Sequence, residues 1–150
     1  MKHAKSAFLA AIMLSTAGCP SFVKAPGPSY TTTPIPEGKA VVHFYRPAQK
    51  IMSSYPFFMS LPESANNCFQ LESGGYTTFQ TDPGDVTVGG IMLTYRQMKL
   101  HLKAGEERFV EIKVVDDDGV MEEVGAAEAK PKLAATRGIN SCSPDQAKKK

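Results

Sequence analysis

The chain has 150 residues, with 17 basic and 15 acidic side chains, 11 prolines and no tryptophan. This length is that of one domain of ordinary size with enough apolar residues to bury a core. A formal net charge of only +2 excludes the broad positive surface expected of a nucleic-acid-binding protein.

The N-terminus has the three-part layout of a secretory signal peptide. Lys2, His3 and Lys5 form a positive start, an apolar stretch follows over residues 7–14, and small residues lead to position 18. The apolar stretch is far shorter than the ~20 residues that a helix needs to span a bilayer. We therefore expect residues 1–18 to be removed on export, leaving a chain without a transmembrane helix.

Cys19 directly follows the small residues Ala17 and Gly18. This arrangement resembles the lipobox of bacterial lipoproteins, from which it departs at Thr16, where leucine is usual. The resemblance implies that Cys19 becomes the first residue and carries acyl chains, which anchor a protein stably when there is more than one. The alternative is a plain secretory signal with an incidental cysteine. Pro20 in the next position favours the outer membrane, with the protein facing the periplasm.

Residues 19–38 contain five prolines among serine, threonine and glycine. This composition predicts an extended tether that reaches on the order of 60 Å at ~3.1 Å per residue. Residues 39–125 are predicted to form the folded domain. Residues 126–150 form a C-terminal segment with a basic, solvated tail.

From residue 39 onward the chain consists of short runs rich in β-branched and aromatic residues, separated by turn residues. These runs predict strands over residues 39–46, 55–61, 68–71, 76–81, 85–89, 91–102, 108–115 and 120–124. A short helical turn is predicted near the C-terminus, with Pro131 limiting its N-terminal extent and Gly138 ending it. The fold class is therefore all-β, an antiparallel β-sandwich of seven or eight short strands with a short C-terminal helical turn.

Three segments in this order resemble the bacterial lipoproteins grouped as domain of unknown function 2846. They read AVVHFYRP over residues 40–47, GGYTTFQTDPGD over residues 74–85 and LHLKAGEERFVEIKV over residues 100–114. The resemblance covers about 75 residues of the domain, and the anchor in addition. It implies a fold and a location in the envelope, but no catalytic residues, because the family has no assigned activity.

Cys68 and Cys142 remain as one possible disulfide in the oxidising exported compartment. A bridge between them would close a loop of about 75 residues, for which the chain-entropy estimate is roughly 4 to 5 kcal/mol. The alternative is two free thiols, with Cys68 buried in the core. Three cysteines without a CxxC pair do not indicate a zinc site.

Other candidate chemistry has structural alternatives. His43 and His101 lie in separate strand runs without the spacing of a metal or acid-base pair. The residues around Asp116 do not match a calcium loop, and a hairpin turn is the preferred interpretation. Ser73 and Tyr76 resemble the Ser-Gly-x-x-Tyr loop of membrane-bound lysozyme inhibitors, although the spacing differs by one residue. A turn between two strands explains them equally.

These observations predict a membrane-anchored envelope lipoprotein that acts as a non-catalytic interaction module. Its expected partners are the membrane, through lipid on Cys19, and an envelope protein or the cell wall. No enzyme activity, cofactor or metal is predicted. The alternative function is a periplasmic inhibitor of a host hydrolase such as lysozyme, or a small-ligand binder.

Overall fold

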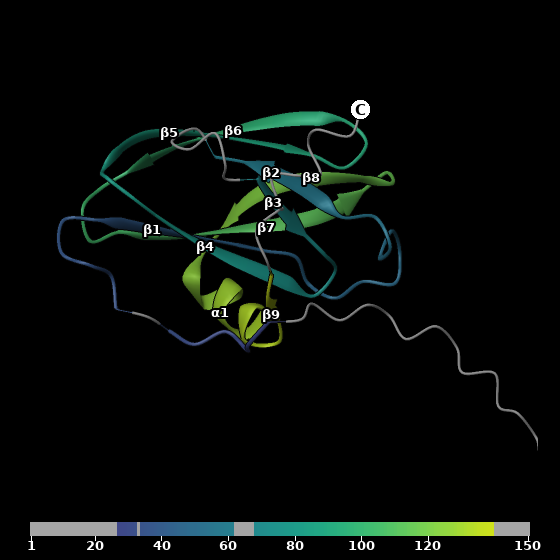
Figure 1. The fold of residues 1–150 in the computed structure, drawn as a ribbon, viewed down its shortest axis with the longest axis horizontal. Helices are drawn as coiled ribbons and strands as arrows, with labels where there is room; N and C mark the ends of the chain where they lie inside the picture. The colour runs from purple at the N-terminus through teal and green to yellow at the C-terminus, as the bar shows by residue number, and fades with distance from the viewer. Residues whose placement is uncertain (1–26, 33, 62–67, 140–150) are drawn as a thin grey trace, which may run out of the picture.

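The computed structural model describes residues 27–32, 34–61 and 68–139, which form two β-sheets and one short helix (Figure 1). The first sheet has the order β8 (Asp118–Val124), β7 (Glu107–Val115), β1 (Ala40–Tyr45), β4 (Gly75–Thr81) and β9 (Arg137–Gly138). The second sheet has the order β3 (Cys68–Leu71), β2 (Phe57–Ser60), β5 (Gly84–Ile91) and β6 (Tyr95–Leu102). The helix α1 (Ala126–Ala134) lies against the outer face of the first sheet.

The predicted fold class is confirmed, because the chain is all-β in two sheets with a short C-terminal helix. Every predicted strand segment overlaps one of β1 to β8, although the segment predicted over residues 91–102 begins in β5 and includes the β5–β6 turn. Strand β9 is an addition that the sequence did not predict. Most strand pairs are antiparallel, but β1 with β7 and β4 with β9 are parallel. The connection from β1 to β7 runs through the whole second sheet, which lets two distant strands lie side by side in the same direction.

The inner faces of the two sheets share one hydrophobic core. It contains buried residues from both sheets, including Val42 and Phe44 of β1, Met59 of β2 and Val88 of β5. Strand β1 is buried at all six positions because the core covers one of its faces and a second apolar cluster covers the other. A mostly apolar run such as AVVHFY is typical of a strand that is covered on both sides.

The second cluster lies on the outer face of the first sheet, where α1 covers it. Ala129 and Leu133, four residues apart on one face of the helix, are fully buried against Tyr45 and Phe109. The prediction that Pro131 limits the helix was wrong, because the helix begins at Ala126 and continues through the proline. Packing of this apolar face offsets the cost of a proline within a short helix.

The packed part of the chain extends beyond the predicted boundaries at 39 and 125. Gly27 donates a backbone hydrogen bond to Gly138 at 2.9 Å, and Gly138 donates one to Pro28 at 2.8 Å. Ser29 forms a β-bridge with Arg137. Residues 27–29, which the sequence placed in the tether, are therefore joined to the edge of the first sheet.

Several predictions concern residues outside the described ranges. These are the signal peptide over residues 1–18, the anchor Cys19, and the tail that contains Cys142. Cys68 begins β3, but the described ranges do not include its side chain, so the Cys68–Cys142 disulfide stays a prediction. Within the described ranges, no helix combines the length and the apolar character needed to cross a membrane.

Candidate functional site

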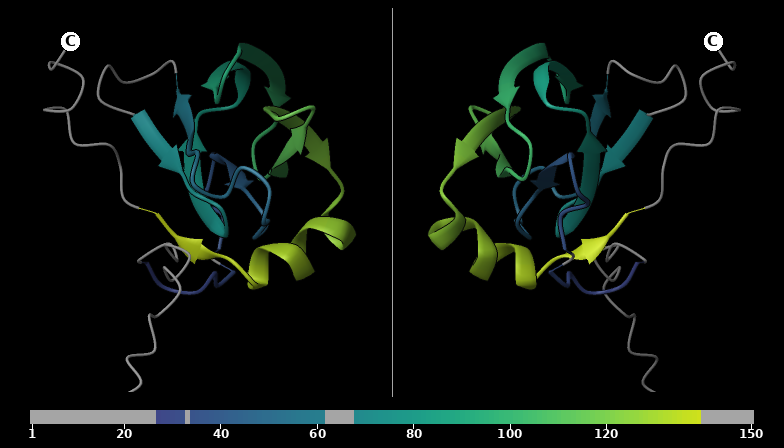
Figure 2. Two further views of the ribbon diagram at one scale, coloured as in Figure 1. Left: turned by 90° about the vertical axis from the view of Figure 1, so that its right-hand side faces the viewer. Right: turned by 90° about the vertical axis from the view of Figure 1, so that its left-hand side faces the viewer.

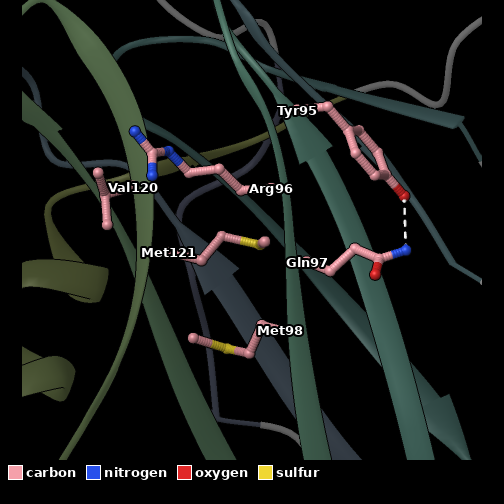
Figure 3. Close-up of a pocket in the computed structure, with 6 residues that line it drawn as sticks. All are labelled: Tyr95, Arg96, Gln97, Met98, Val120 and Met121. Carbon is pink, nitrogen blue, oxygen red and sulfur yellow. Dashed lines mark hydrogen bonds between the residues drawn. The ribbon is translucent and has the colours of Figure 1, made fainter.

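A groove lies where the two sheets meet along one open side of the sandwich (Figure 3). Its walls are β6, the last strand of the second sheet, and β8, the last strand of the first sheet. It is open to solvent, has a volume of about 450 Å³ and is lined by Tyr95, Arg96, Gln97, Met98, Val120 and Met121. Both strands pair on one side only within the described part of the chain, so each presents backbone N–H and C=O groups along its free edge.

The floor of the groove is apolar and its rim is polar. Met98 and Met121 both pack against the shared core, and their side chains lie close to one another in Figure 3. Methionine side chains are flexible and polarisable, and they adapt to differently shaped apolar partners. On the rim, the Gln97 amide donates a hydrogen bond to the Tyr95 hydroxyl at 3.1 Å. This combination suits an extended peptide that alternates apolar and polar side chains.

Asp118 fixes one end of the groove, since it holds the β5–β6 turn against β8. One carboxylate oxygen accepts hydrogen bonds from the N–H groups of Leu93, Thr94 and Gly119, at 3.0, 3.2 and 2.8 Å. The other oxygen pairs with Arg96 at 3.1 Å. Burial alone would raise the pKa of Asp118, but these N–H donors hold the pKa far below its usual range.

The hairpin turn predicted near this point is present, but its three aspartates are not equivalent. Asp116 and Asp117 are exposed, and both adopt a positive φ, near 50° and 61°, as a two-residue hairpin turn requires. Asp118 is buried instead of solvated. The sequence did not identify its role, because all its partners other than Gly119 lie more than 20 residues away along the chain.

Substitutions at Asp118 are expected to separate its role as a hydrogen-bond acceptor from the effect of its negative charge. Asp118→Ala leaves three N–H groups and Arg96 without an acceptor and should lower the free energy of unfolding by about 3 kcal/mol. Asp118→Asn keeps the oxygen that accepts the N–H groups but loses the charge, so we expect a loss of about 1 to 2 kcal/mol. Urea denaturation followed by circular dichroism measures both values.

The depressed pKa of Asp118 adds a pH dependence to this prediction. Its contribution to stability is fully present above the unfolded-state pKa of ~3.9 and is lost as the pH falls through the lower folded-state pKa. The native protein should therefore lose stability on acidification below about pH 4 more steeply than Asp118→Asn. Parallel pH profiles for the two proteins would contradict a low pKa at Asp118.

The two histidines are not brought together. His43 is buried in the first sheet, between the Thr78 hydroxyl at 2.9 Å and the Glu107 carboxylate at 3.0 Å, and it stacks on Phe109. Burial lowers the pKa of His43, and the hydrogen bond to Glu107 opposes that shift. His101 is exposed on the second sheet and pairs with Asp85 across the strands at 2.7 Å. No group of three potential metal ligands occurs within the described residues.

Ser73 and Tyr76, the candidate inhibitor loop, are engaged within the domain. The Ser73 hydroxyl bonds to the backbone of Gln49 at both its N–H and its C=O. The Tyr76 ring is half-buried and packs edge-on against Tyr30. Gly74, which lies between them and has a φ of 78°, donates its N–H to the Arg46 carbonyl. These contacts give the segment a structural role in joining the end of β1 to the start of β4.

A buried carboxylate links α1 to the first sheet. Glu111 of β7 accepts a hydrogen bond from the Tyr45 hydroxyl at 2.9 Å and pairs with Lys132 of α1 at 2.7 Å. Glu111 and Glu128 raise the pKa of Lys132 to about 12, and burial together with Glu111 raises the pKa of Tyr45. Each polar group here has a partner within the domain, so the arrangement holds the helix in place.

Comparisons with known proteins add no functional assignment. No protein-family model, no curated protein and no solved structure matches the chain. The function of the groove between β6 and β8 therefore has to follow from its shape and its lining residues.

Proposed function

We propose that this chain is a lipid-anchored protein of the bacterial cell envelope, attached through Cys19 to the outer membrane and facing the periplasm. We further propose that it is a non-catalytic module that binds an extended segment of an envelope protein between β6 and β8. The groove between two strands with free edges carries this proposal. The relationship to the lipoproteins of domain of unknown function 2846 is part of the same proposal and rests on the segments quoted above.

Strand addition is the mode of binding that this groove favours. A partner strand beside β6 or β8 would satisfy backbone groups that have no partner strand among the described residues, and main-chain hydrogen bonds would supply affinity. Specificity would come from alternate side chains of the partner, of which one set faces Met98 and Met121. Arg96, held by Asp118, would limit how far the bound segment extends.

Site-specific crosslinking in intact cells tests this proposal. A photoreactive amino acid in place of Gln97, on the groove rim, should give a covalent adduct of one defined mass. The same amino acid in place of Gln80, an exposed glutamine on β4 outside the groove, should give none. Val120→Arg adds a long charged side chain to β8, the strand that forms one wall of the groove, and should remove the adduct. In Cys19→Ala, the protein should leave the membrane fraction and the adduct yield should fall.

The outcomes separate the parts of the proposal. Equal adducts from positions 97 and 80, or an adduct that persists in Val120→Arg, would contradict binding in the groove. A native protein whose mass shows no acyl groups on Cys19 would contradict the lipid anchor, whatever the groove does.

A further inference from the structure

In the part of the chain that the structure describes, the exposed large apolar side chains are gathered at one end of the sandwich. Among the described residues, the large hydrophobic side chains that are exposed are Ile51, Tyr55, Phe58, Ile91, Leu93, Tyr95 and Val115, which we call the apolar end. Ile51 and Leu93 are the most exposed, at 66% and 57%. Soluble monomers expose scattered apolar residues routinely, but gathering all of them at one end indicates a surface that is covered in use.

The strand register explains why these residues meet. Phe58 of β2 is the cross-strand partner of Ile91 of β5, and Ile91 is the partner of Tyr95 of β6, so the three form one row across the outer face of the second sheet. Leu93 lies in the β5–β6 turn beyond this row. Val115 precedes the β7–β8 turn, which Asp118 ties to the β5–β6 turn.

The loop after β1 supplies the remaining apolar residues at the same end. Arg46, at the end of β1, donates hydrogen bonds from its guanidinium to the carbonyls of Met52 and Tyr55. This fixes the segment that carries Ile51 and Tyr55. In Figure 1 this loop, the β5–β6 turn and the β7–β8 turn all lie on the right-hand side, and the left panel of Figure 2 looks onto that end.

The chain also limits how far this end lies from the anchor. Gly27 is joined to Gly138, which pairs with Tyr76 at the start of β4, and Tyr76 is the partner of Tyr45 at the end of β1. With a strand spacing of about 4.8 Å, Gly27 lies roughly 15 Å across the sheet from the end of β1. Seven residues lie between Cys19 and Gly27, and the eight steps from one to the other span at most about 28 Å even when fully extended.

We propose that the apolar end docks into the interface of the membrane that holds the lipid on Cys19, so that the domain lies on this membrane instead of standing away from it. This inference rests on the proposed lipid anchor. The shortened tether keeps the domain within reach of the bilayer surface at high local concentration. Tyr55 and Tyr95 each present an aromatic ring with a polar hydroxyl, a combination enriched at membrane–water interfaces.

The charges around the apolar end favour insertion over electrostatic attraction. Lys50 and Arg96 lie near it, but Asp116 and Asp117 are exposed on the β7–β8 turn and Asp118 pairs with Arg96. The positive charges are thus offset by acidic ones. Docking should therefore occur on zwitterionic lipid and should gain little from anionic lipid, in contrast to a polybasic surface.

The absence of tryptophan from the chain permits a direct test. The chain from residue 19 onward carries Cys19→Ser and a hexahistidine tag ahead of position 19, which binds it to phosphatidylcholine vesicles through a nickel-chelating lipid. Leu93→Trp places a single reporter at the apolar end, and Gln80→Trp places one at an exposed position near the opposite end of β1. Phosphatidylcholine with brominated acyl chains quenches tryptophan that enters the membrane.

We expect Leu93→Trp to lose most of its emission on brominated vesicles and to shift it to shorter wavelength, and Gln80→Trp to keep both. Equal emission of the two variants on brominated and ordinary vesicles would overturn the proposal. Quenching that occurs only when the vesicles contain phosphatidylglycerol would show that charge attraction, not insertion of apolar side chains, holds the domain on the membrane. That result would also overturn the proposal. A shift in Leu93→Trp that depends on protein concentration without vesicles would assign the surface to a second copy of the chain instead.

The tag makes this test independent of the natural anchor. The mass of the native chain isolated from cell membranes reports whether Cys19 carries acyl groups. A native chain without acyl groups would contradict the proposed anchor. Tryptophan at position 93 that is not quenched would contradict only the docking of the apolar end.

Discussion

Arg46→Ala is expected to lower the free energy of unfolding by about 3 to 5 kcal/mol. Arg46 is fully buried, and its guanidinium holds the carbonyls of Met52 and Tyr55. Its removal leaves a cavity and two carbonyls without a donor, each of which costs about 1 to 3 kcal/mol when it stays buried. Burial also lowers the pKa of Arg46, although the group stays charged at neutral pH.

Two further substitutions show whether the hydrogen bonds or the volume of Arg46 matter. Arg46→Met fills much of the space without a donor, so most of the loss should persist. Arg46→Lys keeps the charge but has one ammonium group in place of a planar fork, and an intermediate loss is expected. The exposed Arg96→Ala serves as the matched control and should cost about 1 kcal/mol or less.

Urea denaturation gives these free energies, and hydrogen exchange locates the change. Amides over residues 51–55 should exchange faster in Arg46→Ala, because the guanidinium no longer holds this segment. If Arg46→Ala lowered the free energy of unfolding by no more than Arg96→Ala does, the buried guanidinium would contribute little to stability. Membrane docking of the apolar end gives a second readout of Arg46→Ala, since Ile51 and Tyr55 lie in the segment that Arg46 fixes.

The strands of this fold were predictable because their sequence patterns are local. Short runs rich in aromatic and β-branched residues, bounded by turn residues, mark β2 and β4, whose burial alternates along the strand. The mostly apolar run AVVHFY, interrupted only by His43, marks β1 as a strand buried on both faces. The same signal could have indicated that His43 is buried, since it lies in the middle of that run.

The features that the sequence did not reveal depend on contacts between distant residues. The extent of α1 is set by the burial of Ala129 and Leu133 against another element, which overrides Pro131. β9 has two residues, too few for a pattern, and is a strand only because Gly75 and Tyr76 lie beside it. Residues 27–29 have the composition of a spacer, yet they bind to this short strand.

The candidate groove illustrates the same limit. The sequence identified β6 and β8 as strands, but their positions as the end strands of two sheets follow only from the strand order. The pairing of β1 with β7 decides this order, and these strands are separated by more than 60 residues along the chain. Edge positions, and with them the binding surface, cannot be assigned until such long-range pairs are known.

The second large effect is expected at Phe57, whose ring fills the space between two glycines on opposite sheets. Phe57 is fully buried, and a Cβ added to Gly90 of β5 or Gly119 of β8 would overlap its ring. Phe57→Ala should lower the free energy of unfolding by about 3 to 5 kcal/mol. Gly90→Ala should cost at least about 1 to 3 kcal/mol, because the ring has no room to move within a close-packed core.

A double-mutant cycle tests whether the ring and the glycine are matched. Phe57→Leu is smaller and relieves the overlap, so Gly90→Ala should cost less in the Phe57→Leu background than in the native protein. Gly125→Ala is the control, because no atom lies near its added Cβ, and it should stay within about 1 kcal/mol of the native value. Strictly additive losses would mean that Gly90 is required for a reason other than the ring of Phe57. A measured coupling would instead show that the contact between Gly90 and Phe57 limits how closely the two sheets approach each other. This contact lies beside the groove, because Met121 of the groove floor also lies close to Gly90.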